Sequence, residues 1–201
     1  MIVVLTNNKG GTGKTTYSTI ISQIMVNSGL KVVAVDLDHA QAHLKLFLRK
    51  LGEELNIPVL TSLKEIDKYP HDVTIIDTPP AFSEETFAAI KKADVVVVPI
   101  NRDKTGLLGL KEVASHVDKD KIIVVTSQWK MNTRFNADLY EQLEGLGFKG
   151  APNIPENIQI IHNRDANRSW DYGIPAKQAE PYLKLVKAIL SIGKGGKKHG
   201  R

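Results

Sequence analysis

Short runs of apolar residues recur along the chain, and longer segments with helical spacing separate them. Five of these runs are four residues long, rich in valine and isoleucine, and lack the alternation of a half-exposed strand. Such runs are typical of strands buried on both faces in a parallel sheet. The runs are Ile2–Leu5, Val32–Val35, Val73–Ile76, Val95–Val98 and Ile122–Val125. A weaker strand is expected at Ile57–Leu60.

The intervening segments predict helices at about 14–28, 40–51, 83–92, 105–116 and 133–146. This alternation predicts an α/β fold, a doubly wound, mostly parallel sheet with helices on both faces. The stretch 148–175 contains three prolines and is expected to form mainly loops and short turns. A last helix is expected from Glu180 to Ser191, ending before Gly193. We therefore expect a single domain over 1–192 and a flexible basic tail over 193–201.

A glycine-rich segment, Lys9-Gly10-Gly11-Thr12-Gly13-Lys14-Thr15-Thr16, follows the first strand and leads into the first helix. It matches the phosphate-loop pattern G-x-x-x-x-G-K-[ST], except that Asn8 stands at the first glycine position. Its glycines let backbone N–H groups converge on phosphate oxygens at a helix N-terminus. Lys14 would reach the β- and γ-phosphates, the Thr15 hydroxyl would bind Mg²⁺, and Thr16 would donate to the α-phosphate. The chain is therefore expected to be a P-loop NTPase that binds ATP and Mg²⁺.

Carboxylates follow two of the predicted strands. Asp36 and Asp38 come directly after the second strand, and Asp77 comes directly after Val73–Ile76, followed by Thr78-Pro79-Pro80. Ligands of open parallel sheets bind outside the carboxyl ends of the strands. An acid at such a strand end can hold Mg²⁺ through water. These positions predict that the carboxylates lie beside the phosphate loop.

A second lysine, Lys9, stands five residues before Lys14. With it, the loop has the form K-G-G-x-G-K-T-T and resembles the deviant Walker A ATPases of the ParA/MinD group. The resemblance implies that Lys9 contacts nucleotide in a partner subunit, so that ATP joins two monomers face to face. Lys9 and Lys14 are then both catalytic residues and nucleotide ligands.

The resemblance also assigns roles to the carboxylates. It implies that Asp38 orients or activates the attacking water, and that Asp36 and Asp77 belong to the Mg²⁺ shell through water. The Thr15 hydroxyl is expected to bind the ion directly. The Asp-Thr-Pro-Pro segment that begins at Asp77 looks like the second switch of the family. The first switch departs from the family pattern D-x-D-P-Q, because His39-Ala40-Gln41 follows Asp38 here. A histidine in place of the proline is expected to alter the geometry of this switch.

Weaker matches to the family extend over nearly the whole chain. They comprise Val95–Val98 with Pro99, Gly106–Leu110, Ile154–Asn157 and Tyr172–Pro175. Adenine contacts are expected from the loops Ser127–Met131 and Ile154–Asn157, with Pro155 as the nucleotide-binding residue of the second loop.

The positive charge is concentrated at the C-terminal end. The chain carries a net charge of +5, whereas residues 176–201 carry seven Lys or Arg and one acid, Glu180. Such asymmetry favours a polyanionic partner, although a solvated polar tail has the same composition. With the family resemblance, it predicts a ParA-type partition ATPase, a homodimer formed with ATP that binds DNA nonspecifically. A centromere-bound ParB-like partner would stimulate its weak hydrolysis and so segregate plasmid or chromosome. The expected DNA contacts are Arg164, Arg168, Lys184, Lys187, Lys197 and Lys198.

Three other functions remain open. The first is a MinD-like ATPase that docks on membranes by a C-terminal amphipathic helix, although a stripe at helical spacing is also typical of core packing. The second is a metabolic P-loop ligase of the cobyrinate or dethiobiotin synthase type, which needs a dedicated substrate pocket. The third is a non-catalytic nucleotide sensor, which the presence of Asp38 and Asp77 disfavours. The stripe of the first alternative comprises Tyr182, Leu183, Val186, Ile189 and Leu190.

The absence of cysteine excludes a disulfide framework and a thiolate zinc site. The opening run Ile2–Leu5 is interpreted as a core strand and not as a signal peptide. No apolar run approaches the roughly 20 residues of a membrane span. We expect a cytoplasmic, nucleoid-associated protein that resembles compact partition ATPases without an operator-binding domain.

Overall fold

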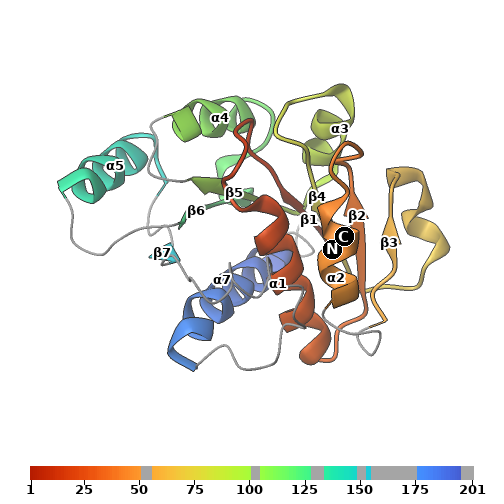
Figure 1. Ribbon diagram of the computed structural model, residues 1–201. Coiled ribbons are helices and arrows are strands. Elements are labelled where there is room, and N and C mark those ends of the chain that lie inside the picture. Colours follow the sequence, from red (N-terminus) through yellow and green to blue (C-terminus); the bar gives the residue numbers. More distant parts are fainter. Residues whose placement is uncertain (51–55, 101–104, 128–133, 149–152, 155–175, 196–201) are drawn as a thin grey trace.

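In the computed structural model the described residues form a seven-stranded sheet, and all of the strand pairings among them are parallel (Figure 1). The structure describes residues 1–50, 56–100, 105–127, 134–148, 153–154 and 176–195. The strand order is β3-β2-β4-β1-β5-β6-β7, which places β1 in the middle. The strands are β1 (Ile2–Leu5), β2 (Val32–Asp36), β3 (Val59–Leu60), β4 (Val73–Asp77), β5 (Val95–Ile100), β6 (Ile122–Ser127) and β7 (Asn153–Ile154).

Helices follow most of the strands, as the sequence predicts. The α-helices are α1 (Lys14–Asn27), α2 (His43–Lys50), α3 (Glu84–Lys92), α4 (Thr105–Ala114), α5 (Arg134–Gly145) and α7 (Ala176–Gly195). The short 3₁₀ helices η2 (Leu63–Lys68) and η3 (Lys119–Lys121) precede β4 and β6. The helix termini differ from the expected ones by a few residues, because local pattern locates helix ends poorly.

Two hydrophobic clusters lie on opposite faces of the sheet and explain the continuous apolar runs. Along β1, Val3 and Leu5 belong to the cluster covered by α1, α2 and α7, whereas Val4 belongs to the cluster covered by α3, α4 and α5. All three side chains are buried. Because successive strand residues point to opposite faces, a strand between two helical layers must be apolar throughout. The predicted doubly wound fold is confirmed (Figure 1).

The structure adds one short strand near the C-terminus and corrects one prediction there. The stretch expected to be mainly loops contributes the two-residue strand β7, whose Asn153 pairs with Thr126 of β6. The last helix is longer than expected and continues past Gly193 to Gly195. Gly193 is buried, and a Cβ added there would lie 3.1 Å from Cγ of Met1. The glycine therefore permits close packing of α7 on the start of the chain and does not end the helix.

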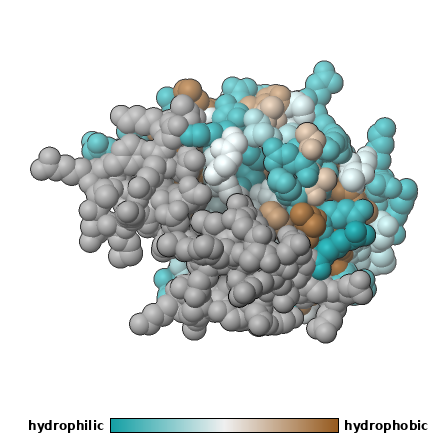
Figure 2. All heavy atoms as spheres, in the orientation of Figure 1, coloured by the Kyte–Doolittle hydropathy of each residue, from teal (hydrophilic) through white to brown (hydrophobic). Residues whose placement is uncertain are grey.

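Helix α7 buries most of the apolar stripe that a membrane-docking helix would need. Tyr182, Val186 and Ile189 are 5%, 4% and 0% exposed and pack in the cluster with α1. Only Leu183 of that stripe is well exposed, at 44%. None of the helices in the described ranges has the length and apolar character to cross a bilayer. In Figure 2 the described part of the drawn face is mostly hydrophilic, with apolar residues in small groups.

Candidate functional site

The carboxyl ends of β1, β2 and β4 lie side by side in the centre of the sheet. In the strand register, Asp77 pairs with both Leu5 and Asp36. The two carboxylates therefore lie on neighbouring strands, beneath the loop that leaves β1. As the sequence predicts, this edge brings together the phosphate loop and the acidic strand ends.

The phosphate loop has the backbone conformation of an anion cradle. Gly11 and Gly13 adopt left-handed φ angles of 72° and 91°, which favour glycine. A Cβ on Gly13 would also approach the Tyr17 ring to 3.3 Å. Helix α1 begins with no side-chain cap and no acidic residue in its first turn. Its first N–H groups and its dipole are therefore directed at the loop, where an anion binds favourably.

Lys14 is a buried cation at the start of α1. Its side chain is 7% exposed, and its Nζ donates to the carbonyl oxygen of Lys9 at 3.0 Å. Burial lowers the pKa of Lys14, while the nearby charges of Asp77 and Asp38 oppose this shift. An ammonium group held in low dielectric beside the cradle interacts strongly with a polyanion.

Asp77 carries a buried carboxylate with one unsatisfied oxygen. Asp77 is 1% exposed. Its Oδ1 accepts a hydrogen bond from the Ser18 hydroxyl at 3.2 Å, and its Oδ2 has no hydrogen-bond partner. Burial raises the pKa of Asp77 to about 7, against the opposing hydrogen bond from Thr15 and the charge of Lys14. A carboxylate oxygen left unsatisfied beside a threonine hydroxyl matches the oxygen ligands that Mg²⁺ and its water shell require. The site thus fits the expected Mg²⁺.

Asp36 and Asp38 shape the loop between β2 and α2. The Asp36 carboxylate accepts the N–H of Asp38 through Oδ1 and the N–H of Leu44 through Oδ2, each at 3.1 Å. Burial raises the pKa of Asp36, and these backbone hydrogen bonds oppose the shift. Asp38 accepts from the N–H of Gln41 at 3.3 Å. Asp36 therefore organises the loop that carries Asp38, and its expected place in the Mg²⁺ shell stays a prediction.

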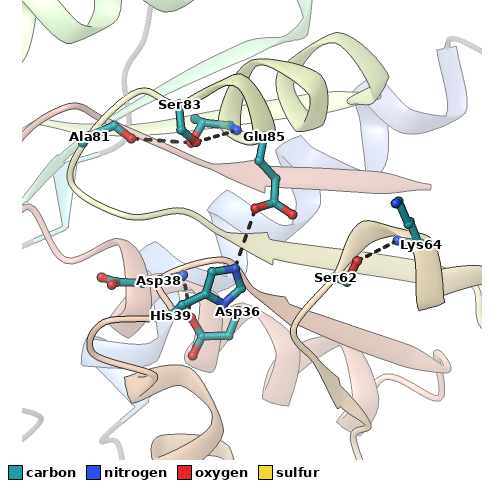
Figure 3. Close-up of polar contacts among 9 residues, drawn as sticks. Asp36, Asp38, His39, Ser62, Lys64, Ala81, Ser83 and Glu85 are labelled. Atoms are coloured by element: carbon teal, nitrogen blue, oxygen red, sulfur yellow. Dashed lines mark hydrogen bonds and ion pairs between the residues drawn. The ribbon is translucent and has the colours of Figure 1, made fainter.

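The histidine that departs from the family pattern extends from this loop towards α3 (Figure 3). His39 Nε2 lies 3.7 Å from Oε2 of Glu85, and both side chains are well exposed. Glu85 stands in the first turn of α3, which Ser83 caps by accepting the N–H of Thr86. The contact connects the loop after β2 with the segment after β4, the two segments that carry Asp38 and Thr78.

A pocket of about 400 Å³ is lined by the phosphate loop, the loop after β2, helix α2 and the segment after β4. Sequence reasoning placed the phosphate loop, Asp38 and the segment after Asp77 here, but it did not foresee a wall formed by α2. His43 and Phe47 stack in that wall with ring centroids 5.6 Å apart. No motif marks these residues, and only the helical spacing of α2 indicated that one face would pack inward. The lining comprises Gly10, Gly11, Thr12, Gly13, Lys14, Thr15, Thr16, Asp38, Gln41, His43, Leu46, Phe47, Thr78 and Pro80.

The expected DNA contacts are only partly within the described residues. Lys184 and Lys187 lie on the exposed face of α7, where Lys184 Nζ forms an ion pair of 2.8 Å with Glu180. The remaining expected contacts and the adenine-loop residue lie outside the described residues and stay predictions. These are Arg164, Arg168, Lys197, Lys198 and Pro155.

Comparison with known sequences matches residues 3–168 to the CobQ/CobB/MinD/ParA nucleotide binding domain. An uncharacterized ATP-binding protein, MJ0547 of Methanocaldococcus jannaschii, is 28% identical over 87% of this chain and 68% of its own length. The sporulation initiation inhibitor protein Soj of Bacillus subtilis is 23% identical over 96% of this chain and 99% of its own.

Solved structures with the same fold include nucleotide complexes. The ATP complex of McdA(D38A) from Cyanothece has a TM-score of 0.74 at 18% identity, covering 94% of this chain and 95% of its own. Cobyrinic acid a,c-diamide synthase of Mycobacterium smegmatis, bound to an ATP analog and magnesium, has a TM-score of 0.69 at 20% identity. That alignment covers 100% of this chain and 96% of the synthase chain. At these identities the likeness establishes the fold.

Proposed function

The chain belongs to the CobQ/CobB/MinD/ParA nucleotide-binding domain family, and we propose that it is a ParA-type partition ATPase. In this proposal ATP joins two copies into a dimer that binds DNA nonspecifically. A ParB-like protein at the centromere stimulates hydrolysis of ATP by water to ADP and phosphate, which releases the dimer from the nucleoid. A relative from Mycoplasma pneumoniae that is described as a ParA family protein supports this choice within the family.

One observation carries the proposal. The residues Gly10–Thr16 line a single pocket together with Asp38, Thr78 and Pro80 from the two neighbouring loops. Lys9 directly precedes this lining, and its backbone carbonyl accepts Lys14 Nζ at 3.0 Å. The second lysine of the motif therefore stands next to the phosphate loop, which supports its proposed action on nucleotide in a second copy.

The Mg²⁺ ion would be held by the Thr15 hydroxyl and, through water, by Asp77. Among the described residues, no group of three His, Cys, Asp or Glu side chains could hold a metal ion by itself. Mg²⁺ usually keeps several water ligands and is bound through one or two carboxylates together with substrate phosphates, so the nucleotide phosphates would supply further oxygen ligands here. When bound, the ion would neutralise charge on the phosphates.

Asp38 is proposed to orient the attacking water. It stands in the loop that Asp36 holds through two backbone hydrogen bonds, and its carboxylate accepts the N–H of Gln41 in the same loop. Positioning a water molecule against the γ-phosphate is a large part of what a protein contributes to this reaction. Lys14 and Lys9 would stabilise the negative charge that develops on the phosphates.

Sedimentation velocity with ATP, with ADP and without nucleotide tests the switch. We expect an ATP-dependent dimer for the wild type and monomers for Lys9→Ala and Lys14→Ala. Lys14→Ala should also lose nucleotide binding, whereas Lys9→Ala should still bind ADP as a monomer. A wild type that is monomeric with ATP would contradict the proposed switch, and a dimeric Lys9→Ala would contradict the cross-subunit role alone.

DNA retention on a filter tests the second half of the proposal. Binding should require ATP and should fall steeply between 50 and 200 mM salt, because lysine contacts to phosphates release counterions. Lys184→Ala/Lys187→Ala should weaken retention at least tenfold. The matched control is Lys91→Ala/Lys92→Ala, which removes two exposed lysines from α3 on the opposite helical layer. Equal retention by all variants and nucleotide states would refute a DNA switch based on α7.

The MinD-like alternative is weakened by the burial of Tyr182, Val186 and Ile189 in the core. Co-sedimentation with anionic liposomes should therefore be no greater with ATP than with ADP. The metabolic-ligase alternative keeps the same fold, as the synthase structure illustrates. Turnover of ATP that responds to DNA and a protein partner, without any small acceptor molecule, would separate a partition ATPase from a ligase.

A further inference from the structure

A buried amide, Asn7, lies between the end of β1 and the phosphate loop. Asn7 is 0% exposed, and its side-chain amide both donates and accepts hydrogen bonds. Nδ2 donates to the carbonyl oxygen of Pro99 at 2.8 Å and, more weakly, to that of Gly106 at 3.5 Å. Oδ1 accepts the N–H of Lys9 at 3.2 Å. The amide therefore joins the end of β5 and the start of α4 to the backbone of Lys9.

Helix α4 approaches this amide so closely that a glycine is required. A Cβ added to Gly109 would lie 2.6 Å from Oδ1 of Asn8 and closer still to Oδ1 of Asn7. Glycine inside a helix costs about 1 kcal/mol relative to alanine. The close approach of the α4 backbone to Asn7 gives a physical reason for this unfavourable choice. The helix and the amide therefore form one packed unit.

The backbone of Lys9 is held from both sides of its peptide group. Its N–H is fixed by Asn7, and its carbonyl oxygen accepts Lys14 Nζ at 3.0 Å and the Thr12 hydroxyl at 3.4 Å. The Lys14 bond connects the same residue to the centre of the phosphate cradle. The direction in which the Lys9 side chain leaves the loop depends on this backbone.

We propose that Asn7 is a positioning residue for Lys9. Its hydrogen bonds direct the Lys9 side chain towards nucleotide in the second subunit and couple that orientation to the position of α4. This inference rests on the proposed cross-subunit role of Lys9. The position demands an amide, because it needs one donor for Pro99 and one acceptor for Lys9. An aspartate supplies two acceptors and a buried charge, and an alanine supplies neither group.

The experiment compares Asn7→Ala, Asn7→Asp and Gly109→Ala with the wild type. The control is Gly145→Ala, at the last residue of α5, where an added Cβ meets nothing within 4 Å. We measure the ATP-dependent dimerisation constant, the affinity for ADP, kcat and thermal stability. The three site variants should weaken dimerisation and lower kcat by about tenfold, as expected for the loss of a positioning hydrogen bond. Their affinity for ADP should stay within about threefold of the wild type, and the control should match the wild type throughout.

A double-variant cycle separates positioning from packing. Asn7→Ala should have no further effect on dimerisation in a Lys9→Ala background, measured at protein concentrations high enough to populate the weakened Lys9→Ala dimer, since residues that act as one unit are not additive. Additive losses, a tenfold loss of ADP affinity, or a fall in melting temperature with unchanged dimerisation would each overturn the inference. A wild type that fails to dimerise would refute the proposed function as well, whereas a dimeric wild type with dimeric Asn7 variants would refute this inference alone. Gly109→Ala leaves the amide itself intact, so it tests the inference even if Asn7→Ala does not fold.

Discussion

At the scale of single residues, Asp77 shows how the proposed function opposes stability. Its Oδ2 is buried without a partner, and burial raises its pKa to about 7. The positive charge of Lys14 opposes this shift, but Lys14 is itself partly desolvated. Strain of this kind is common at sites that bind charged ligands, because the ligand supplies the missing partner.

Asp77→Asn should stabilise the nucleotide-free protein at pH 8 and abolish magnesium-dependent ATP hydrolysis. The folded pKa of Asp77 lies above the ordinary value of 3.8, so between about pH 4 and 7 the folded state binds more protons than the unfolded state. Wild-type stability from this group therefore falls as the pH rises through that window. The asparagine variant lacks this loss, so its stability advantage over the wild type should grow from about pH 4 and reach roughly 4 kcal/mol above pH 7.

Urea denaturation from pH 5 to 8, in EDTA and without nucleotide, measures this effect. Ser18→Ala is the control, because it removes a hydrogen bond to Oδ1 but leaves the carboxylate in place. Parallel pH profiles for wild type and Asp77→Asn would show that the buried carboxylate does not cost stability.

At the scale of elements, α7 carries two different surfaces on one helix. Leu185 is 0% exposed in the cluster with α1, whereas Leu183, two residues earlier, is 44% exposed beside Lys184. The inner face packs on the sheet, and the outer face presents lysines to solvent. The same helix can therefore serve the core and a polyanion at once, since the two tasks use different faces.

Leu185→Ala should destabilise the protein by about 2–5 kcal/mol, because it leaves a cavity in a packed core. Leu183→Ala, the same change on the exposed face, should cost less than about 1 kcal/mol. Equilibrium denaturation by urea compares the two variants. A larger loss for Leu183→Ala would contradict the packing of α7 that the structure describes.

At the scale of the whole molecule, the site lies between two helical layers that meet at the end of β1. One layer supplies α1 and α2, and the other supplies α3 and α4, each with its own hydrophobic cluster. The phosphate loop contacts both layers, through the start of α1 and through Asn7 beside α4. A ligand in the pocket would therefore stabilise the fold as a unit.

ATP with Mg²⁺ should raise the melting temperature by about 5–10 °C at a concentration 100 times the dissociation constant. This corresponds to about 2.7 kcal/mol of linkage for a chain of this size. EDTA should remove most of the increase, because the unsatisfied Asp77 oxygen then lacks its magnesium-bound water. Scanning calorimetry measures the shift, and Lys14→Ala should show none. An equal shift for Lys14→Ala would exclude the phosphate loop as the binding site.

The sequence alone determined the strands, their burial on both faces, and the phosphate loop. These features are local, because a run such as Val95–Val98 and a loop such as Gly10–Thr16 carry their physical reasons within a few residues. Chain order also placed Asp77 at a strand end, and the parallel sheet then placed it beside the loop.

Only the tertiary structure decided which residues surround that chemistry. The bond from Asn7 to Pro99 spans 92 positions, and the Asp77 contact to Ser18 spans 59. The inward face of α2, the backbone bonds of Asp36 and the glycine of α4 likewise depend on how separate elements pack. Periodicity cannot specify such contacts, because each one depends on the position of a second element that is distant in sequence. Local chemistry thus predicted where phosphate would bind, and packing decided how the binding loop is held.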